Sequence, residues 1–157
     1  MTEQKTFNTQ KKINKTVRLV ALEIWILVFY KNKKFDDIIK NSFDFNKLDK
    51  RDKSFLFLLI NTCMRRHNQA KKIYNKYSRF GIKKKNRYLN GILVISTIQL
   101  IWLNIAPYAV LSEAVNQAKI YIGEKQSKLV NAILRKIVTN KNDCLNFIPE
   151  DKCNLPE

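Results

Sequence analysis

The stretch that decides the fold of this chain is its least charged one, Tyr88–Ala106, which reads YLNGILVISTIQLIWLNIA. No charged side chain follows it until Glu113, whereas the segment just before it, Arg79–Arg87, is crowded with lysine and arginine. A transmembrane helix needs about 20 mostly apolar residues, so a membrane span is one interpretation. The other is the central helix of a soluble bundle, apolar on all sides because other helices surround it.

The surroundings of this stretch favour the buried helix. Its hydrophobicity is diluted by five polar side chains, Asn90, Ser96, Thr97, Gln99 and Asn104. The flanking segments carry apolar residues at intervals of three and four, which predicts amphipathic helices with stripes that need a partner. A single membrane span would leave those stripes uncovered. We therefore expect a core helix here and a chain that does not enter a membrane.

The composition predicts one all-α domain with a strong attraction for polyanions. A chain of 157 residues can bury a sizeable core, and only 3 Gly and 3 Pro favour long helices over many short strands. The 30 Lys and Arg residues outnumber the 13 Asp and Glu residues, which gives a formal net charge of +17. Such a charge attracts nucleic acid or an anionic membrane surface.

The periodicity predicts about seven helices between two terminal segments. Residues 1–10 are expected to be a flexible tail, residues 11–139 a helical domain, and residues 140–157 a linker or tail. The expected helices are at about 11–28, 35–43, 49–66, 67–78, 88–106, 107–123 and 124–139. Asp49 is the predicted N-cap of the third helix, and Pro107 is expected in the first turn of the sixth.

Two groups of cations are candidates for contact with a polyanion. On the first expected helix, Lys11, Lys15 and Arg18 fall on a face separate from the apolar stripe, with Lys12 beside them. A solvated surface is the alternative role for this edge. The second group is Lys83–Lys85 with Arg87, just before the uncharged stretch.

Aromatic residues alternate with the cations around this second group. Tyr74, Tyr77, Phe80 and Tyr88 could stack on unpaired bases, or could anchor a polar segment to its neighbours. The sequence favours the anchoring role, because aromatic residues near short polar segments more often pack against neighbouring helices.

The residues needed for common catalytic sites are missing. The three glycines, Gly81, Gly91 and Gly123, lie in separate segments and cannot form a phosphate-binding loop. One histidine leaves little room for a nucleophile–histidine pair. Cys63 lies four residues before His67, but a metal site would lack further ligands, so a buried thiol is expected. We expect no cofactor, no metal and no catalysis by this chain alone.

The cysteines and the N-terminus indicate the compartment. Three cysteines, Cys63, Cys144 and Cys153, are an odd set without a CxxC pair, which is typical of a reducing environment. The segment MTEQKTFNTQKK has no apolar region of the secretory type behind it. A cytoplasmic location is expected.

Several short motifs, in order, resemble those of NusB-like domains. Residues 107–115, PYAVLSEAV, are similar to the P-x-x-x-x-x-E-A-V signature, and Ala118, Lys119 and Gly123 follow it. Upstream, residues 52–65 resemble the D-R-x-[FA] helix with its closing arginine, although Lys53 replaces the usual arginine. Val17–Arg18 and Ala21 fit the first-helix pattern A-R-x-x-A. The resemblance covers residues 12–137.

The ending of the resemblance points to a subgroup. Residues 130–135, VNAILR, are similar to the V-N-A-[VI]-L-R motif of the NusB-like domain that begins RsmB-type 16S ribosomal RNA cytosine-5 methyltransferases. The antitermination factors more usually have glycine where this chain has Ala132. In the RsmB-type enzymes, a linker resembling residues 154–157, NLPE, leads into the domain that binds S-adenosylmethionine. Neither Cys144 nor Cys153 follows a proline, as the catalytic cysteine of those enzymes does.

This resemblance implies an all-α, NusB-like bundle of two packed helical subdomains that binds RNA, with ribosomal RNA expected. The main hypothesis is the N-terminal part of a methyltransferase without its catalytic domain. The alternative is a NusB-type antitermination factor, which would also bind a small-subunit ribosomal protein or a transcription complex. A small basic membrane protein is the third possibility. The residues expected at the RNA are Lys11, Lys12, Lys15, Arg18, Lys53, Arg65 and Arg66.

Overall fold

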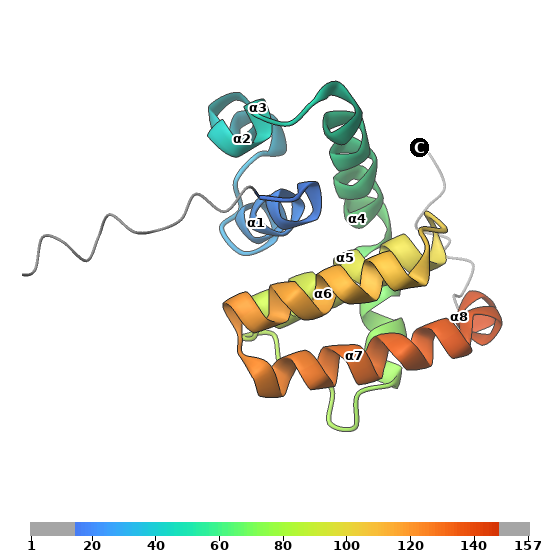
Figure 1. Ribbon diagram of the computed structural model, residues 1–157. Coiled ribbons are helices and arrows are strands. Elements are labelled where there is room, and N and C mark those ends of the chain that lie inside the picture. The colour runs from blue at the N-terminus through green and yellow to red at the C-terminus, as the bar shows by residue number, and fades with distance from the viewer. Residues whose placement is uncertain (1–14, 148–157) are drawn as a thin grey trace, which may run out of the picture.

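A computed structural model describes residues 15–147, and within that range the chain consists of helices joined by loops, with no strand (Figure 1). The expected tail 1–10, residues 148–157 of the expected linker 140–157, and Lys11 and Lys12 lie outside the described residues. The described part of the chain contains eight helices: α1 Val17–Phe29, α2 Phe35–Asn41, α3 Phe43–Asn46, α4 Lys50–Lys76, α5 Arg87–Ile101, α6 Pro107–Tyr121, α7 Glu124–Thr139 and α8 Lys141–Phe147. The all-α prediction is confirmed.

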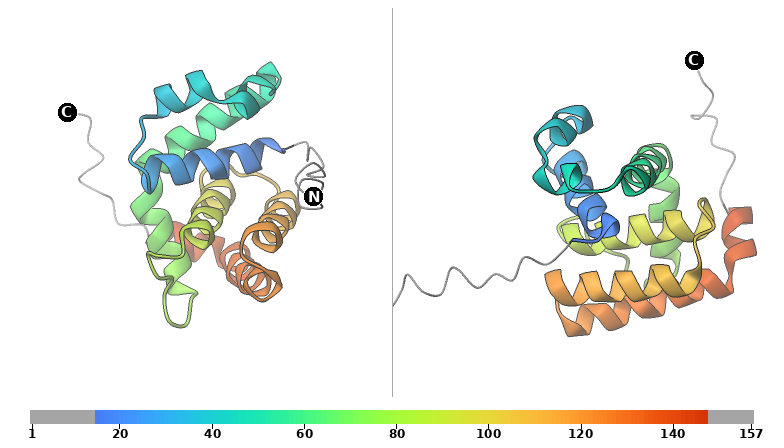
Figure 2. Two further views of the ribbon diagram at one scale, coloured as in Figure 1. Left: turned by 90° about the vertical axis from the view of Figure 1, so that its left-hand side faces the viewer. Right: turned by 45° about the horizontal axis from the view of Figure 1, so that its top comes forward.

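The helices form two groups that share one core. Helices α1–α4 lie together, and α5, α6 and α7 lie side by side beneath them in both figures (Figures 1 and 2). The long helix α4 contacts both groups, and α1 packs on α5 as well as on α4. The buried apolar side chains of all these helices join in a single hydrophobic cluster. The two groups are therefore parts of one packed domain.

The uncharged stretch is the central helix, α5. Every residue from Leu89 to Ile101 is buried. A methyl group added at Gly91 would lie 2.7 Å from Leu22 Cδ1 and 2.9 Å from Trp25 Cε3, so the missing side chain lets α1 approach α5 closely. Within residues 15–147, no helix combines the length and the apolar character needed to cross a membrane.

Two of the buried polar residues of α5, Asn90 and Gln99, link the helix to its neighbours. The Asn90 amide donates to the Lys83 carbonyl at 2.9 Å, and its oxygen accepts a 2.6 Å hydrogen bond from the Tyr74 hydroxyl. The Gln99 oxygen accepts from Arg18 Nε at 2.6 Å. Buried polar groups are costly unless they are hydrogen-bonded, and these contacts remove that cost while fixing the positions of α1 and α4.

Besides the end of α5, which is at Ile101 and not at Ala106 as predicted, the structure differs from the predicted helices at four places. Segments 49–66 and 67–78, predicted as two helices, form the continuous 27-residue α4, because no Gly or Pro interrupts it and Ala70, Ile73 and Tyr74 continue its buried side. Helix α1 begins at Val17, since the Thr16 hydroxyl caps it by accepting from Leu19 N. Ser42 caps the unpredicted α3 in the same way.

The fourth difference lies after Thr139, where the sequence pattern predicted no further helix. The chain continues as α8, which contacts α5 and α7. Its Cys144 side chain is only 2% exposed. One well-buried residue in a seven-residue helix gives little periodic signal, which explains why the pattern did not reveal it.

Candidate nucleic-acid interface

Lys15 lies just before α1 and is held by two carboxylates. Its Nζ is 2.9 Å from Glu23 of α1 and 2.8 Å from Asp44 of α3. The pKa of Lys15 is raised, mainly by the hydrogen bond to Asp44 and also by Glu23, against the opposing effect of burial. The side chain remains 33% exposed. The positive charge of Lys15 is therefore outnumbered by the two carboxylates that contact it.

The side chains of Arg18 and Lys53 also have partners within the domain. Besides its hydrogen bond to Gln99, the Arg18 guanidinium lies 5.4 Å from the centre of the Phe55 ring. Lys53 Nζ lies 5.4 Å from the Phe45 ring centre, next in sequence to Asp44. Lys15 and Lys53 both contact α3, at Asp44 and Phe45, and Arg18 lies in the first turn of α1 against α4 and α5. We call these three residues the N-terminal basic cluster.

The remaining predicted cations lie elsewhere on α4. Arg65 is 12 residues beyond Lys53, which at 1.5 Å per helical residue is about 18 Å along the axis. Its side chain is exposed and has no partner among residues 15–147. Arg66 donates to Gln69 at 3.1 Å and lies 5.7 Å from the Trp102 ring centre. These two arginines are not part of the N-terminal basic cluster.

A second cationic surface is the connection between α4 and α5, residues 77–86, together with Arg87 at the start of α5. We call residues 77–87 the basic loop. It projects from the body of the molecule as the narrow green loop at the bottom of Figure 1 and of the left panel of Figure 2. Its five cations are all exposed: Arg79, Lys83, Lys84, Lys85 and Arg87. No acidic residue occurs anywhere between Asp52 and Glu113, so the loop lies in a segment of uniformly positive charge.

The sequence marked Lys83–Lys85 and Arg87 as candidates for contact with a polyanion, but the seven expected RNA contacts did not include them. The sequence did contain a signal for them, since five cations and no acid lie between residues 79 and 87. The prediction gave more weight to the first helix, where the family resemblance and the charge pattern agreed.

The structure assigns different roles to the four aromatic residues around the loop. The Tyr74 ring is fully buried and hydrogen-bonded to Asn90. Tyr77 contacts the Cys144 sulfur at 3.6 Å, and Tyr88 stacks on Tyr121 with ring centres 4.5 Å apart. These three are anchors, as the sequence favoured. Phe80 is 89% exposed.

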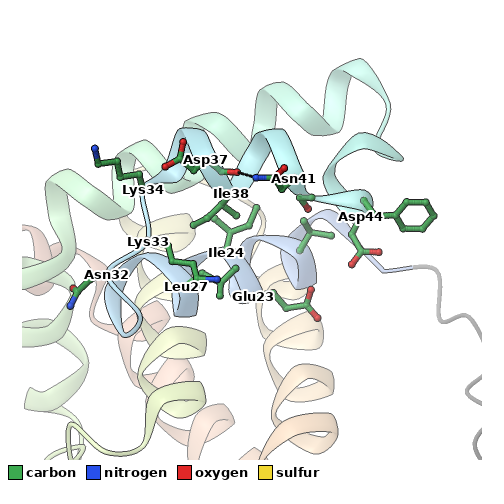
Figure 3. A pocket seen from close by; sticks show the side chains of 13 residues that line it. Glu23, Ile24, Leu27, Asn32, Lys33, Lys34, Asp37, Ile38, Asn41 and Asp44 are labelled. Carbon is green, nitrogen blue, oxygen red and sulfur yellow. Dashed lines mark hydrogen bonds between the residues drawn. The ribbon is translucent and has the colours of Figure 1, made fainter.

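A surface cavity with a volume of about 690 Å³ lies between α1 and the α2–α3 segment. Figure 3 shows Ile24, Leu27 and Ile38 at its centre, with Lys33 and Lys34 at one end and Glu23 and Asp44 at the other. The acidic end is the one that holds Lys15. Because it mixes both signs of charge over an apolar floor, this cavity is a poor site for phosphate groups.

The single histidine and the buried thiol are packed rather than arranged as ligands. The His67 ring stacks on Phe29 with centres 4.4 Å apart, and burial together with Lys71 lowers its pKa. Burial raises the pKa of Cys63, so this thiol is a weak ligand and nucleophile. Within the part of the chain that the structure describes, no three His, Cys, Asp or Glu side chains gather to hold a metal ion.

The chain is similar to known proteins in both sequence and fold. Over 65 residues, the chain is 43% identical to the transcription antitermination protein NusB of Buchnera aphidicola subsp. Cinara cedri (strain Cc). This match covers 39% of this chain and 46% of that protein. The solved structure of T. maritima NusB superimposes with a TM-score of 0.71 over 85% of this chain and 96% of that one, at 19% identity.

The T. maritima structure supports the fold alone, because its sequence identity is low. The pattern that defines the NusB family matches residues 11–139, which include α1 through α7. The chain therefore belongs to the NusB family.

Proposed function

We propose that this protein binds RNA as a transcription antitermination factor of the NusB type. The observation that carries the proposal is the family match over residues 11–139, to which the antitermination protein of Buchnera adds a closer local similarity. The surface charge agrees with it. A chain with a net charge of +17 and two separate groups of cations provides the electrostatic attraction that RNA binding needs.

Binding would act by charge and shape. Lysine and arginine contacts to phosphates supply most of the affinity and release bound counterions, so the association constant should fall steeply as salt rises. The predicted contacts fit this role to different extents. Arg65 is exposed and has no partner in the described chain, whereas Lys15 would have to give up contacts with Glu23 and Asp44 to reach a phosphate.

Filter binding of the full chain to a ribosomal RNA hairpin, at salt concentrations from 50 to 500 mM, tests the proposal. The logarithm of the association constant should decrease linearly with the logarithm of the salt concentration. An affinity that does not change with salt, or no binding at low salt, would contradict it.

An antitermination factor would also bind a protein partner, and we propose a small-subunit ribosomal protein or another component of the transcription complex. Affinity purification of the tagged chain from cells, with and without ribonuclease, tests this part. Partners that persist after ribonuclease treatment support a direct protein contact. A preparation that yields only ribosomal RNA fragments and no such protein argues against it.

The second candidate is the RNA-binding module of an RsmB-type methyltransferase. Its specific support is the motif VNAILR at residues 130–135. Val130, Ile133 and Leu134 of this motif are buried, so much of it stabilises the fold of either subgroup. Sequencing the gene beyond codon 157 distinguishes the two candidates. A downstream reading frame with a cofactor-binding domain and a Pro-Cys motif supports the methyltransferase, and its absence supports the antitermination factor.

A further inference from the structure

We propose that the basic loop binds single-stranded RNA and that the Phe80 ring stacks on an unpaired base. This inference rests on the proposed function, because it assumes that the chain binds RNA. It adds the place of contact, the residue that stacks on a base, and a preference for unpaired over duplex RNA.

The first observation is that the loop carries an exposed apolar ring. Phe80 is 89% exposed, while Tyr74, Tyr77 and Tyr88 around it all pack against other side chains. The one partner described for the ring is the guanidinium of Arg79, whose carbon lies 5.3 Å from the ring centre. Single-stranded nucleic acid is bound by such a combination, an exposed aromatic face for a base with cations for the backbone.

The second observation is that the loop is fixed to the body beneath Phe80. The Asn75 side-chain oxygen accepts from Ile82 N at 2.9 Å, and the Tyr30 hydroxyl donates to the Lys84 carbonyl at 2.8 Å. The Asn90 amide holds the Lys83 carbonyl. Gly81, with φ of +70°, supplies the turn after Phe80. A loop that is already ordered loses less conformational entropy when it binds.

The third observation is the distribution of charge. Lys83, Lys84 and Lys85 have their carbonyls or neighbouring backbone tied to the domain, but among residues 15–147 no hydrogen bond or ion pair engages their side chains. They and Arg87 are free to contact successive phosphates. In duplex RNA the bases are already stacked and the major groove is too narrow for side chains, so Phe80 would find no partner there. The loop therefore favours single strands.

The experiment measures binding of the full chain to a 12-nucleotide single-stranded RNA containing 2-aminopurine, and to the same sequence as a duplex. Phe80→Ala should weaken binding to the single strand about tenfold or more, as expected for the loss of one base–aromatic stack, and should change duplex binding little. Phe80→Tyr should retain both the affinity and the change in 2-aminopurine fluorescence, and Phe80→Ala should lose both.

Phe43→Ala is the matched control. Phe43 is also exposed, at 65%, and has Lys47 Nζ 4.2 Å from its ring centre, but it adjoins Asp44. We expect its replacement to leave RNA binding unchanged. Equal losses in the two variants would overturn the proposal, because they would show a general effect of removing an exposed ring.

Three results separate this inference from the proposed function. If the wild-type chain binds no RNA, the proposed function fails. If it binds RNA and Phe80→Ala binds equally well, the function stands and the stacking role of Phe80 is wrong. If Phe80→Ala reduces binding to anionic phosphatidylglycerol vesicles but not to RNA, the loop contacts lipid and the inference is overturned.

Discussion

The N-terminal basic cluster and the basic loop contain similar side chains but use them differently. In the cluster, Lys15 is paired with Glu23 and Asp44, and Arg18 is bonded to Gln99. In the loop, Lys83–Lys85 have backbone anchors while their charged groups have no partner in the described chain. The difference shows that a count of cations along the sequence does not measure the charge that is available to a ligand. The contacts made by each cation decide it.

The largest effect should come from reversing the charge of the loop. We expect Lys83→Glu/Lys84→Glu/Lys85→Glu to weaken RNA binding about 100-fold at low salt and to reduce the salt slope by about 2, as for the loss of three single-strand phosphate contacts. Filter binding measures both. Lys119→Glu/Lys125→Glu/Lys128→Glu is the control, because it changes the net charge equally at exposed positions on α6 and α7. Equal losses in both triple variants would mean that only net charge matters.

The packing that holds the two regions in place is tested at Gly91, where α5 has no side chain between it and Leu22 and Trp25 of α1. We expect Gly91→Ala to lower the free energy of unfolding by about 2 kcal/mol, because the added methyl group would overlap Leu22 and Trp25. Urea unfolding followed by circular dichroism measures this. The same change in a Leu22→Ala background should cost less, since the clash is partly removed. A stabilised Gly91→Ala protein would show that the helices separate without strain.

Lys15 distinguishes a structural cation from an RNA contact. We expect Lys15→Met to lower the free energy of unfolding by about 1 kcal/mol, because Glu23 and Asp44 lose their half-exposed partner. RNA affinity should fall less than about threefold. Urea unfolding and filter binding of the same samples measure the two effects, with Lys31→Met, at an exposed position, as the control. A large loss of RNA affinity with unchanged stability would place Lys15 at the RNA.

The smallest effect is the change in the free energy of unfolding at alkaline pH that is due to Tyr77, the first residue of the basic loop. Burial, with the Cys144 contact, raises the pKa of Tyr77 from 10.0 to about 12. The unfolded state therefore loses this proton first, so the stability that Tyr77 contributes is present below pH 10 and decreases between pH 10 and 12. We expect Tyr77→Phe to reduce that decrease by less than about 1 kcal/mol in urea unfolding at pH 11. At pH 7 the two proteins should differ little, and identical curves at both pH values would contradict the assignment.

The sequence predicted the fold well where the periodic signal was strong and local. The buried α5 followed from the uncharged stretch, and Pro107 marked the first residue of α6. The prediction was wrong about the break at His67, because a polar surface there concealed the buried Ala70, Ile73 and Tyr74. It also missed α8, where one buried cysteine in a short helix provides little pattern.

The candidate surfaces were less predictable from the sequence, because their chemistry depends on distant contacts. Lys15 meets Asp44 across 29 positions, and Arg18 meets Gln99 across 81. No local pattern distinguishes such cations from free ones. For the basic loop the sequence supplied the charge and the aromatic residues, but it could not separate the exposed Phe80 from the packed Tyr74.

The sequence by itself determined the helical class, the central position of α5 and the excess of positive charge. These properties depend on composition and on apolar residues at intervals of three and four, and both can be read directly from the sequence. Only the tertiary structure decided which cations are paired, which aromatic ring remains exposed and where the two cationic surfaces lie. Those outcomes depend on which helices approach each other, and helix packing brings together residues whose separation in the sequence carries no periodic signal.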